Sequence, residues 1–154
     1  INNYKCIMLH PSKLPKYRGG SPIQNQIING EERSAVTLFI MNEKMDAGNI
    51  VFQESMSLSG SISDIFNKIE ELGYKGTMQF LNNPTNGVKQ IEEGTTYFNR
   101  RIEEQSEITF DELKGKSAKY IYNKIRMLQD PYPNPYIKTI DGKKIYIKES
   151  YIGD

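Results

Sequence analysis

The sequence predicts an α/β fold, in which part of a parallel sheet is followed by a small unit that contains β-structure. Three observations lead to this prediction. Short apolar runs bounded by turn residues are typical of buried strands, and the strongest covers residues 35–41. Other segments place apolar side chains at helical spacing. The resulting order is strand, helix, strand, strand, helix, and then a loop, a helix and a hairpin.

The first element is a mostly apolar run over residues 4–9, with a proline close behind it. Such a run is typical of a strand buried on both faces, as in a parallel sheet. Cys6 lies inside the run and is therefore expected to be a buried core residue. Residues 11–20 are expected to form a defined loop, because two prolines fix φ and a glycine pair permits positive φ.

A short helix and two strands come next. The helix is expected to begin at Ser21, an N-cap residue followed by proline, and to end at Gly30. Residues 35–41 and 50–56 then show two strand patterns. The polar connection between them contains Asp46 in an Asp-Ala-Gly sequence, which predicts a loop rather than a helix.

A longer helix follows the second of these strands. Ser61 with Asp64 three residues later resembles a capping box, and apolar residues keep helical spacing beyond it. The helix is expected to continue through Leu81. Gly73 and Gly76 lie within it and allow another element to pack closely.

The last third of the chain is polar up to about residue 109, with a brief extended piece at residues 97–98. Ser117 opens another helix. Residues 136–140 and 145–147 then read as a hairpin, and the Asp-Gly pair between them predicts a type I′ turn.

Composition excludes several classes of protein. Twenty Lys and Arg residues against 19 Asp and Glu residues give a net charge of +1, so no global charge indicates binding to nucleic acid or to a membrane. A single cysteine excludes an intrachain disulfide and is compatible with a reducing compartment. No apolar run is long enough to span a membrane, and no leader is evident, so we expect a soluble cytoplasmic protein without membrane contact.

His10 and Asp46 are the candidates for acid–base chemistry. His10 is the only histidine and directly follows the first predicted strand. Imidazole titrates near neutral pH, and a neighbouring carboxylate can orient it. Both residues are expected at the carboxyl ends of strands, where ligands bind in open α/β sheets. The alternative is that His10 caps a strand and Asp46 closes a turn.

Basic side chains and glycines could bind an anionic substrate. Lys13, Lys16 and Arg18 precede a glycine pair and a helix N-terminus, which together form a plausible anion site. Arg100 and Arg101 form a second pair suited to phosphate, although both groups could equally be solvated surface. The late tyrosines could stack on a base or simply pack. The candidate substrate-binding residues are Ser12, Lys13, Arg18, Gly19, Gly20, Arg100 and Arg101.

Several other chemistries lack their residues. One His and one Cys, far from any acidic cluster, do not make a metal set, so we expect no metal. The phosphate-binding glycine patterns and the nucleophile elbow of serine hydrolases are also absent.

Two motifs resemble those of a known family. Residues 10–23, which begin HisProSerLysLeuProLysTyrArgGlyGlySerPro, are similar to the signature loop of the formyl-tetrahydrofolate-dependent formyltransferases. This group contains methionyl-tRNA formyltransferase and the sugar N-formyltransferases. Residues 35–50 resemble the second motif of that family, in which an aspartate precedes a glycine. The thirty-six positions between His10 and Asp46 match the family's spacing, and residues 97–101 and 125–133 add further similarity.

The resemblance implies both a fold and an activity. Residues 1–94 would be the C-terminal half of a Rossmann-like catalytic domain with a parallel sheet. Residues 95–154 would be a linker, a helix and the beginning of a C-terminal subdomain. Because the chain starts at Ile1 and enters a strand almost at once, we expect a fragment that lacks the N-terminal half of that domain.

The implied reaction transfers a formyl group from N10-formyltetrahydrofolate, a cosubstrate, to a primary amine. His10 would stabilise the oxyanion and help deliver a proton. Asp46 would orient and charge-stabilise His10 and help relay the proton of the amine. The residues implied for the folate site are Leu14, Pro15, Asn42, Glu43, Met45 and Asp46.

Three hypotheses remain for the acceptor and the activity. The near-neutral charge, the loop variant and the basic and tyrosine candidates favour the amino group of a nucleotide-linked amino sugar. Methionyl-tRNA is the alternative acceptor. A folate- or nucleotide-binding domain with little catalysis is the third hypothesis, because Met8 stands where the family usually has an asparagine that can donate a hydrogen bond. A homodimer is left open.

Overall fold

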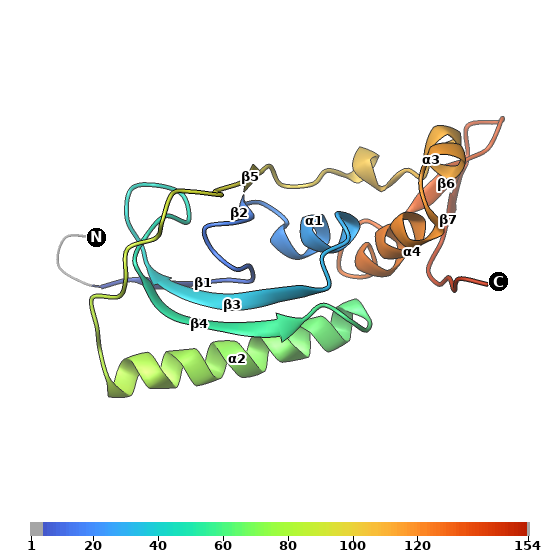
Figure 1. Cartoon of the computed structure of the whole chain (residues 1–154). Coiled ribbons are helices and arrows are strands. Elements are labelled where there is room, and N and C mark those ends of the chain that lie inside the picture. Colours follow the sequence, from blue (N-terminus) through green and yellow to red (C-terminus); the bar gives the residue numbers. More distant parts are fainter. Residues whose placement is uncertain (1–4, 154) are drawn as a thin grey trace.

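A computed structural model describes residues 5–153 (Figure 1). A three-stranded sheet forms the centre of the larger part of the chain. One long helix, α2 (Ile62–Asn82), lies along one face of this sheet, and α1 (Pro22–Ile28) lies on the other side. An extended segment that includes β5 (Tyr97–Phe98) leads to a smaller unit at the far end. The predicted α/β class and the order of its main elements are confirmed.

The strands β1 (Ile7–His10), β3 (Arg33–Ile40) and β4 (Ile50–Ser57) lie in the order β1-β3-β4, and both neighbouring pairs are antiparallel. The expectation that the run at residues 4–9 pairs in a parallel sheet is therefore wrong for the strands that the structure describes. Strand direction depends on how the connections route the chain, and an apolar run does not encode it. The parallel pair is the short one between β2 (Arg18–Gly19) and β5.

β1 is also less buried than predicted. It pairs only with β3 among the described strands, so Met8 and Leu9 are 40% and 38% exposed. Cys6 just before it is exposed, which corrects its assignment to the core. Tyr4, the first residue of the predicted strand, lies outside the described residues.

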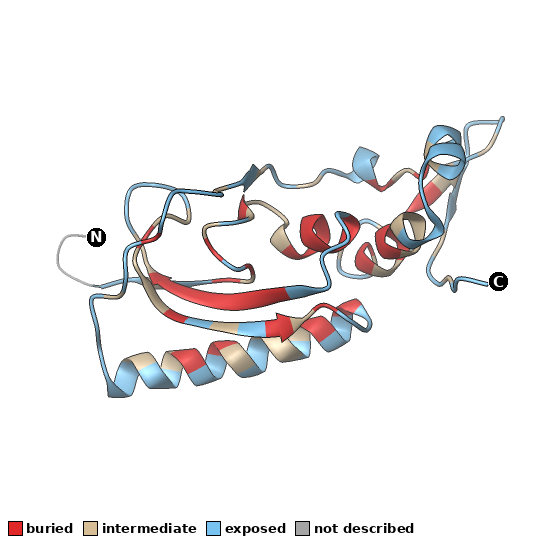
Figure 2. Ribbon diagram, viewed as in Figure 1, coloured by how far each residue is buried: buried red, intermediate tan, exposed pale blue. Residues whose placement is uncertain are grey.

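The core lies between the sheet and its covering helices (Figure 2). Ser61 and Asp64 form the predicted capping box of α2. Gly73 and Gly76 allow the predicted close packing, because a Cβ on Gly73 would lie 2.4 Å from the Leu9 side chain and one on Gly76 2.5 Å from that of Phe52. The buried core residues are Ile23, Ile27, Val36, Leu38, Phe52, Met56, Leu58, Ile62, Ile65 and Met127.

Helix α1 begins where the sequence predicts, but the Ser21 side chain does not cap it. Ser21 takes a left-handed conformation with φ 49° and makes no side-chain cap. Its Oγ instead accepts a hydrogen bond from the backbone N–H of Arg101 at 3.0 Å. The residue that was expected to cap the helix therefore joins the helix start to the extended segment that runs past it.

The far unit contains a 3₁₀ turn η1 (Glu103–Ser106), α3 (Phe110–Gly115) and α4 (Ala118–Met127), and the hairpin of β6 (Tyr136–Lys138) with β7 (Lys144–Tyr146). α4 and the hairpin are confirmed, but η1 and α3 were not predicted. α3 is only six residues long and leaves Phe110 72% and Leu113 50% exposed, so it carries no buried apolar stripe that sequence periodicity could reveal.

The predicted type I′ turn of this hairpin is wrong. Of the Asp141-Gly142 pair, only Gly142 has a positive φ, whereas a type I′ turn needs two such residues. Gly142 N–H donates to Thr139 O, and Thr139 N–H donates to Lys143 O, both at 2.9 Å. The chain uses a longer loop with one left-handed glycine.

None of the helices within residues 5–153 is long and apolar enough to cross a membrane.

Candidate active site

The site is built where β1 ends and two loops meet. His10, the last residue of β1, is only 5% exposed and pairs with Thr37 of β3. Its Nε2 lies 2.7 Å from the carbonyl oxygen of Tyr17, in the loop that follows β1. Its Nδ1 lies 3.6 Å from Oδ2 of Asp46, in the connection between β3 and β4. The structure thus brings the two predicted residues together from segments that are far apart in sequence.

Asp46 is held by its backbone and by its side chain. Its φ of 50° is left-handed, which aspartate tolerates better than most residues. Oδ2 accepts a hydrogen bond from the backbone N–H of Gly19 at 2.7 Å. The same oxygen therefore faces both Gly19 and His10, and the side chain is shielded from solvent, at 11% exposed.

The contacts of the His10 ring define the roles of its two nitrogens. A carbonyl oxygen can only accept, so the bond to Tyr17 requires a hydrogen on Nε2. Nδ1 is then the nitrogen that can accept a proton, and it faces the Asp46 carboxylate. A positive charge formed on the ring would lie next to a buried negative one.

Gly19 and Gly20, which were predicted to help bind an anion, instead allow two segments of the chain to pack closely. A Cβ on Gly19 would lie 2.3 Å from the carbonyl oxygen of Phe98, and one on Gly20 would lie 2.3 Å from the backbone nitrogen of Arg100. Both positions let β2 approach the segment that contains β5. The Gly19 amide is bonded to the Asp46 carboxylate, whereas the Gly20 amide donates to the carbonyl of Phe98.

Arg18 is fully buried and is bonded to groups of this chain. Its guanidinium donates to Gln90 Oε1 at 2.7 Å, to Tyr97 Oη at 2.8 Å and to Glu92 Oε2 at 3.1 Å. Burial lowers the pKa of this guanidinium, but the bonds to Glu92 and Tyr97 outweigh burial and leave the pKa raised. The structure therefore gives Arg18 a structural role in place of the predicted anion-binding one.

The remaining basic and polar candidates do not converge on His10. Ser12 is buried, and its Oγ donates to the carbonyl of Lys16 at 2.7 Å. Lys13 and Arg100 are exposed. The guanidinium of Arg101 donates to Gln105 O at 2.7 Å, and burial lowers its pKa.

The residues predicted for the folate site divide between two hollows. Asn42, Glu43, Met45 and Asp46 line one of about 400 Å³, which Met8 also lines. The other residues of that hollow are Phe39, Met41 and Lys44. Leu14 and Pro15 line a separate hollow of about 580 Å³ beside β4 and residues 88–91.

One residue that contacts the site carried no signal in the sequence. Gln90 is 5% exposed, and its Nε2 donates to the backbone carbonyls of Asp46 and Gly48, both at 2.8 Å. A single glutamine in a polar stretch is ordinarily solvated. Only the path of the chain from α2 back across the loops places it here.

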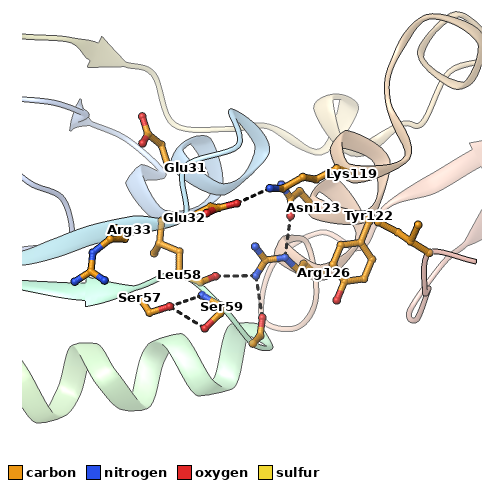
Figure 3. Close-up of a pocket in the computed structure, with 12 residues that line it drawn as sticks. Glu31, Glu32, Arg33, Ser57, Leu58, Ser59, Lys119, Tyr122, Asn123 and Arg126 are labelled. Atoms are coloured by element: carbon orange, nitrogen blue, oxygen red, sulfur yellow. Dashed lines mark hydrogen bonds and ion pairs between the residues drawn. The ribbon is translucent and has the colours of Figure 1, made fainter.

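A further hollow of about 570 Å³ lies between the end of β4 and helix α4 (Figure 3). Arg126 donates to the carbonyls of Leu58 and Gly60, both at 2.9 Å, and Lys119 lies 2.6 Å from Glu32. Burial lowers the pKa of Arg126. His10 and Asp46 are not among the residues that line this hollow.

Among residues 5–153, no group of three or more His, Cys, Asp or Glu side chains could hold a metal ion.

Comparisons with known proteins bear on the whole chain. The family model described as Formyl transferase matches residues 1–81. A methionyl-tRNA formyltransferase from Ehrlichia canis (strain Jake) is 33% identical over 159 residues, which cover 100% of this chain and 49% of that protein. The chain thus spans about half the length of the curated relatives it matches.

Solved structures share the fold. A methionyl-tRNA formyltransferase from Clostridium thermocellum matches with a TM-score of 0.81 and 31% identity, over 95% of this chain and 68% of that one. A sugar N-formyltransferase from a Shewanella species matches at 0.75 and 23% identity, over 99% and 64% of the two chains. HypX from Aquifex aeolicus in complex with tetrahydrofolic acid matches at 0.74 and 19% identity, over 96% and 26%. The predicted formyltransferase-type fold is confirmed.

Proposed function

This chain belongs to the formyl transferase family, and from that premise we propose that its protein transfers a formyl group from N10-formyltetrahydrofolate to a primary amine. The observation that carries the proposal is the shielded pair of His10 and Asp46, with Nδ1 and Oδ2 3.6 Å apart. The remaining ring nitrogen is committed to the Tyr17 carbonyl. The pair is thus arranged to move one proton at one atom.

The proposed chemistry follows from that arrangement. The attacking amine forms a bond to the formyl carbon and must lose a proton, which His10 accepts at Nδ1. The Asp46 carboxylate stabilises the imidazolium that results. The positive charge of that ring stabilises the negative charge that develops on the formyl oxygen. As the bond between the formyl carbon and the folate nitrogen breaks, His10 returns a proton to that nitrogen.

The hollow of about 400 Å³ is the proposed position for the folate ring. Asp46, whose carboxylate faces His10, is one of its lining residues, so a ring bound there would lie close to the His10 pair. Met8 and Met45 give it two partly exposed apolar side chains, 40% and 65% exposed, which suit a flat heteroaromatic ring. The donor supplies the activated formyl group, and the chain supplies the surface that orients it.

We propose methionyl-tRNA as the acceptor. Relatives with that name are 33% and 36% identical to this chain, and the Clostridium structure with that name is 31% identical. The sequence had favoured a nucleotide-linked amino sugar, partly because Arg18, Arg100 and Arg101 could bind a diphosphate. Arg100 is exposed, but the guanidiniums of Arg18 and Arg101 are bonded to groups of this chain, which weakens that reason.

A nucleotide-linked amino sugar remains the second candidate acceptor, since the fold is also that of a sugar N-formyltransferase. The third hypothesis, binding with little catalysis, rests on Met8. Its side chain lines the proposed folate hollow and cannot donate a hydrogen bond to an oxyanion. In the proposed mechanism that stabilisation falls to His10 alone.

The test is an assay of the full-length protein with N10-formyltetrahydrofolate and two acceptor sets, methionyl-tRNA and a panel of nucleotide-linked amino sugars. We expect formylation of methionyl-tRNA, and a loss of at least about 10³-fold in kcat for His10→Ala, because the variant has no group to accept the proton. Formylation of a sugar alone would replace the proposed acceptor with the second candidate. Folate binding without turnover of any acceptor would support the third hypothesis.

A further inference from the structure

Gln90 and Arg18 form a buried polar network behind the Asp46 loop. Arg18 is 0% and Gln90 5% exposed. The Arg18 guanidinium donates to Gln90 Oε1 from Nη2 at 2.7 Å and from Nε at 3.3 Å. From its other end, Gln90 donates through Nε2 to the carbonyls of Asp46 and Gly48. One amide group thus joins Arg18 to the loop that contains Asp46 and Gly48.

The partners fix the orientation of this amide. Arg18 offers only donors and the two carbonyls only acceptors, so a flipped Gln90 would face like groups at both ends. In the observed orientation, both donors of Nε2 and both acceptor positions of Oε1 have partners. A buried network in which every member is satisfied is rigid, and a broken one leaves costly unpaired groups.

The network acts on the two features that hold Asp46 in place. Gln90 bonds the carbonyl of Asp46. The left-handed φ of 50° at Asp46 costs backbone energy and persists only where the surrounding structure holds it. Arg18 directly precedes Gly19, whose N–H holds the Asp46 carboxylate. The backbone of Asp46 and the donor to its side chain are therefore connected through Gln90 and Arg18.

We propose that Gln90 is a positioning residue that keeps the Asp46 carboxylate beside Nδ1 of His10. The proposal rests on the function proposed above and extends it to a residue outside the catalytic pair. Gln90 acts through the Asp46 loop, and none of its bonds is to His10 itself.

Two substitutions separate the two ends of the network. Gln90→Glu keeps an oxygen for Arg18 and replaces the donor to Asp46 and Gly48 with a second acceptor. Gln90→Met removes the bonds at both ends with little change in volume. The matched control is Gln105→Glu, because Gln105 is exposed and its Oε1 accepts from Ile102 N–H, which glutamate can still do.

We expect Gln90→Glu and Gln90→Met to lower kcat about 10- to 100-fold, with the KM for the amine acceptor within about 2-fold of wild type, since a small misplacement of a catalytic group has costs of this size. Gln105→Glu should leave both constants unchanged. In an Asp46→Asn background the Gln90 substitutions should lower kcat by less than about 3-fold, because their effect runs through the Asp46 carboxylate.

A second readout does not depend on activity. The ring Cε1–H signal of His10 in the NMR spectrum of the full-length protein is assigned by its absence from the spectrum of His10→Ala. We expect this signal to shift or broaden in both Gln90 variants and to stay in place in Gln105→Glu. Melting temperatures of all the variants, measured alongside, separate positioning from stability.

The outcomes are distinguishable from those of the proposed function. If the Gln90 variants lose melting temperature but keep the wild-type kcat and His10 signal, Gln90 only stabilises the fold and the proposal is wrong. If the wild-type protein formylates no acceptor, the proposed function fails, and the His10 signal still decides whether Gln90 positions the pair.

Discussion

Replacing Asp46 with asparagine removes one negative charge and keeps the shape of the side chain. Asparagine tolerates the left-handed backbone that Asp46 adopts at φ 50°, and its Oδ1 can still accept from the Gly19 N–H. We therefore expect the free energy of unfolding to change by less than about 1 kcal/mol. What the substitution removes is the carboxylate that faces His10 Nδ1.

The size of the loss follows from the distance and the burial of the pair. Oδ2 and Nδ1 are 3.6 Å apart, and the two side chains are 11% and 7% exposed. Coulomb's law with an effective dielectric constant of about 20 gives about 4 to 5 kcal/mol between the carboxylate and a protonated ring at that distance. In the proposed mechanism the ring accepts the proton of the amine and becomes positive, so this energy acts on the transition state. It corresponds to a decrease of about 10³-fold in kcat.

The assay measures kcat and KM for Asp46→Asn and wild type with N10-formyltetrahydrofolate and methionyl-tRNA. Asp141→Asn is the matched control, since Asp141 lies in the hairpin loop with its side chain 53% exposed. We expect the loss in kcat, with the KM for folate changed by less than about 3-fold. If Asp46→Asn keeps more than about a tenth of the wild-type kcat, the carboxylate does not stabilise charge on His10 and the mechanism is refuted.

Two further predictions concern stability. Gly20→Ala places a Cβ 2.3 Å from the Arg100 backbone, so we expect chemical denaturation to show that the free energy of unfolding falls by about 3 kcal/mol. The control is Gly115→Ala, which should be neutral or slightly stabilising because no atom lies within 4 Å of its Cβ. Equal effects of the two substitutions would contradict the close approach of Gly20 to the Arg100 segment. Lys124→Met leaves Glu112 without its buried partner at 2.8 Å and should cost about 3 kcal/mol near neutral pH. Burial raises the pKa of the Glu112 carboxyl, but hydrogen bonds, chiefly from Lys124, outweigh burial and lower the pKa below its usual value of 4.5. Its contribution to stability is therefore complete above pH 4.5 and is lost as the pH falls through the lower folded-state pKa, so wild type should lose more stability on acidification than Glu112→Gln; equal losses would contradict this assignment.

The elements that sequence predicted well are those whose signals are local. The capping box of Ser61 and Asp64 begins α2, and Ser117 caps α4, because each serine side chain bonds a backbone amide three residues away. The continuous burial of β3 matches its apolar run. Helix α3 and the hairpin turn also depend on local sequence. The apolar pattern of α3 is too weak to predict a helix, and an Asp-Gly pair is compatible with more than one type of turn.

Prediction was poorer where a residue's role depends on distant partners. Arg18 reads as an anion ligand in its own loop, but its guanidinium bonds Gln90, Glu92 and Tyr97, which are 72 to 79 positions away. Gln90 has no local signal at all. Roles of this kind follow from the way the chain crosses itself, which periodicity and turn chemistry do not describe.

The sequence by itself determined the family motifs, the candidate pair of His10 and Asp46 and the α/β order, because these depend on residue types and their spacing. Only the tertiary structure decided that one carboxylate oxygen lies between the Gly19 amide and the His10 ring. It also decided that Arg18 is buried and that its guanidinium bonds Gln90, Glu92 and Tyr97. The physical reason is burial: a charged or polar group removed from water must find partners, and the folded chain, not the neighbouring sequence, supplies them.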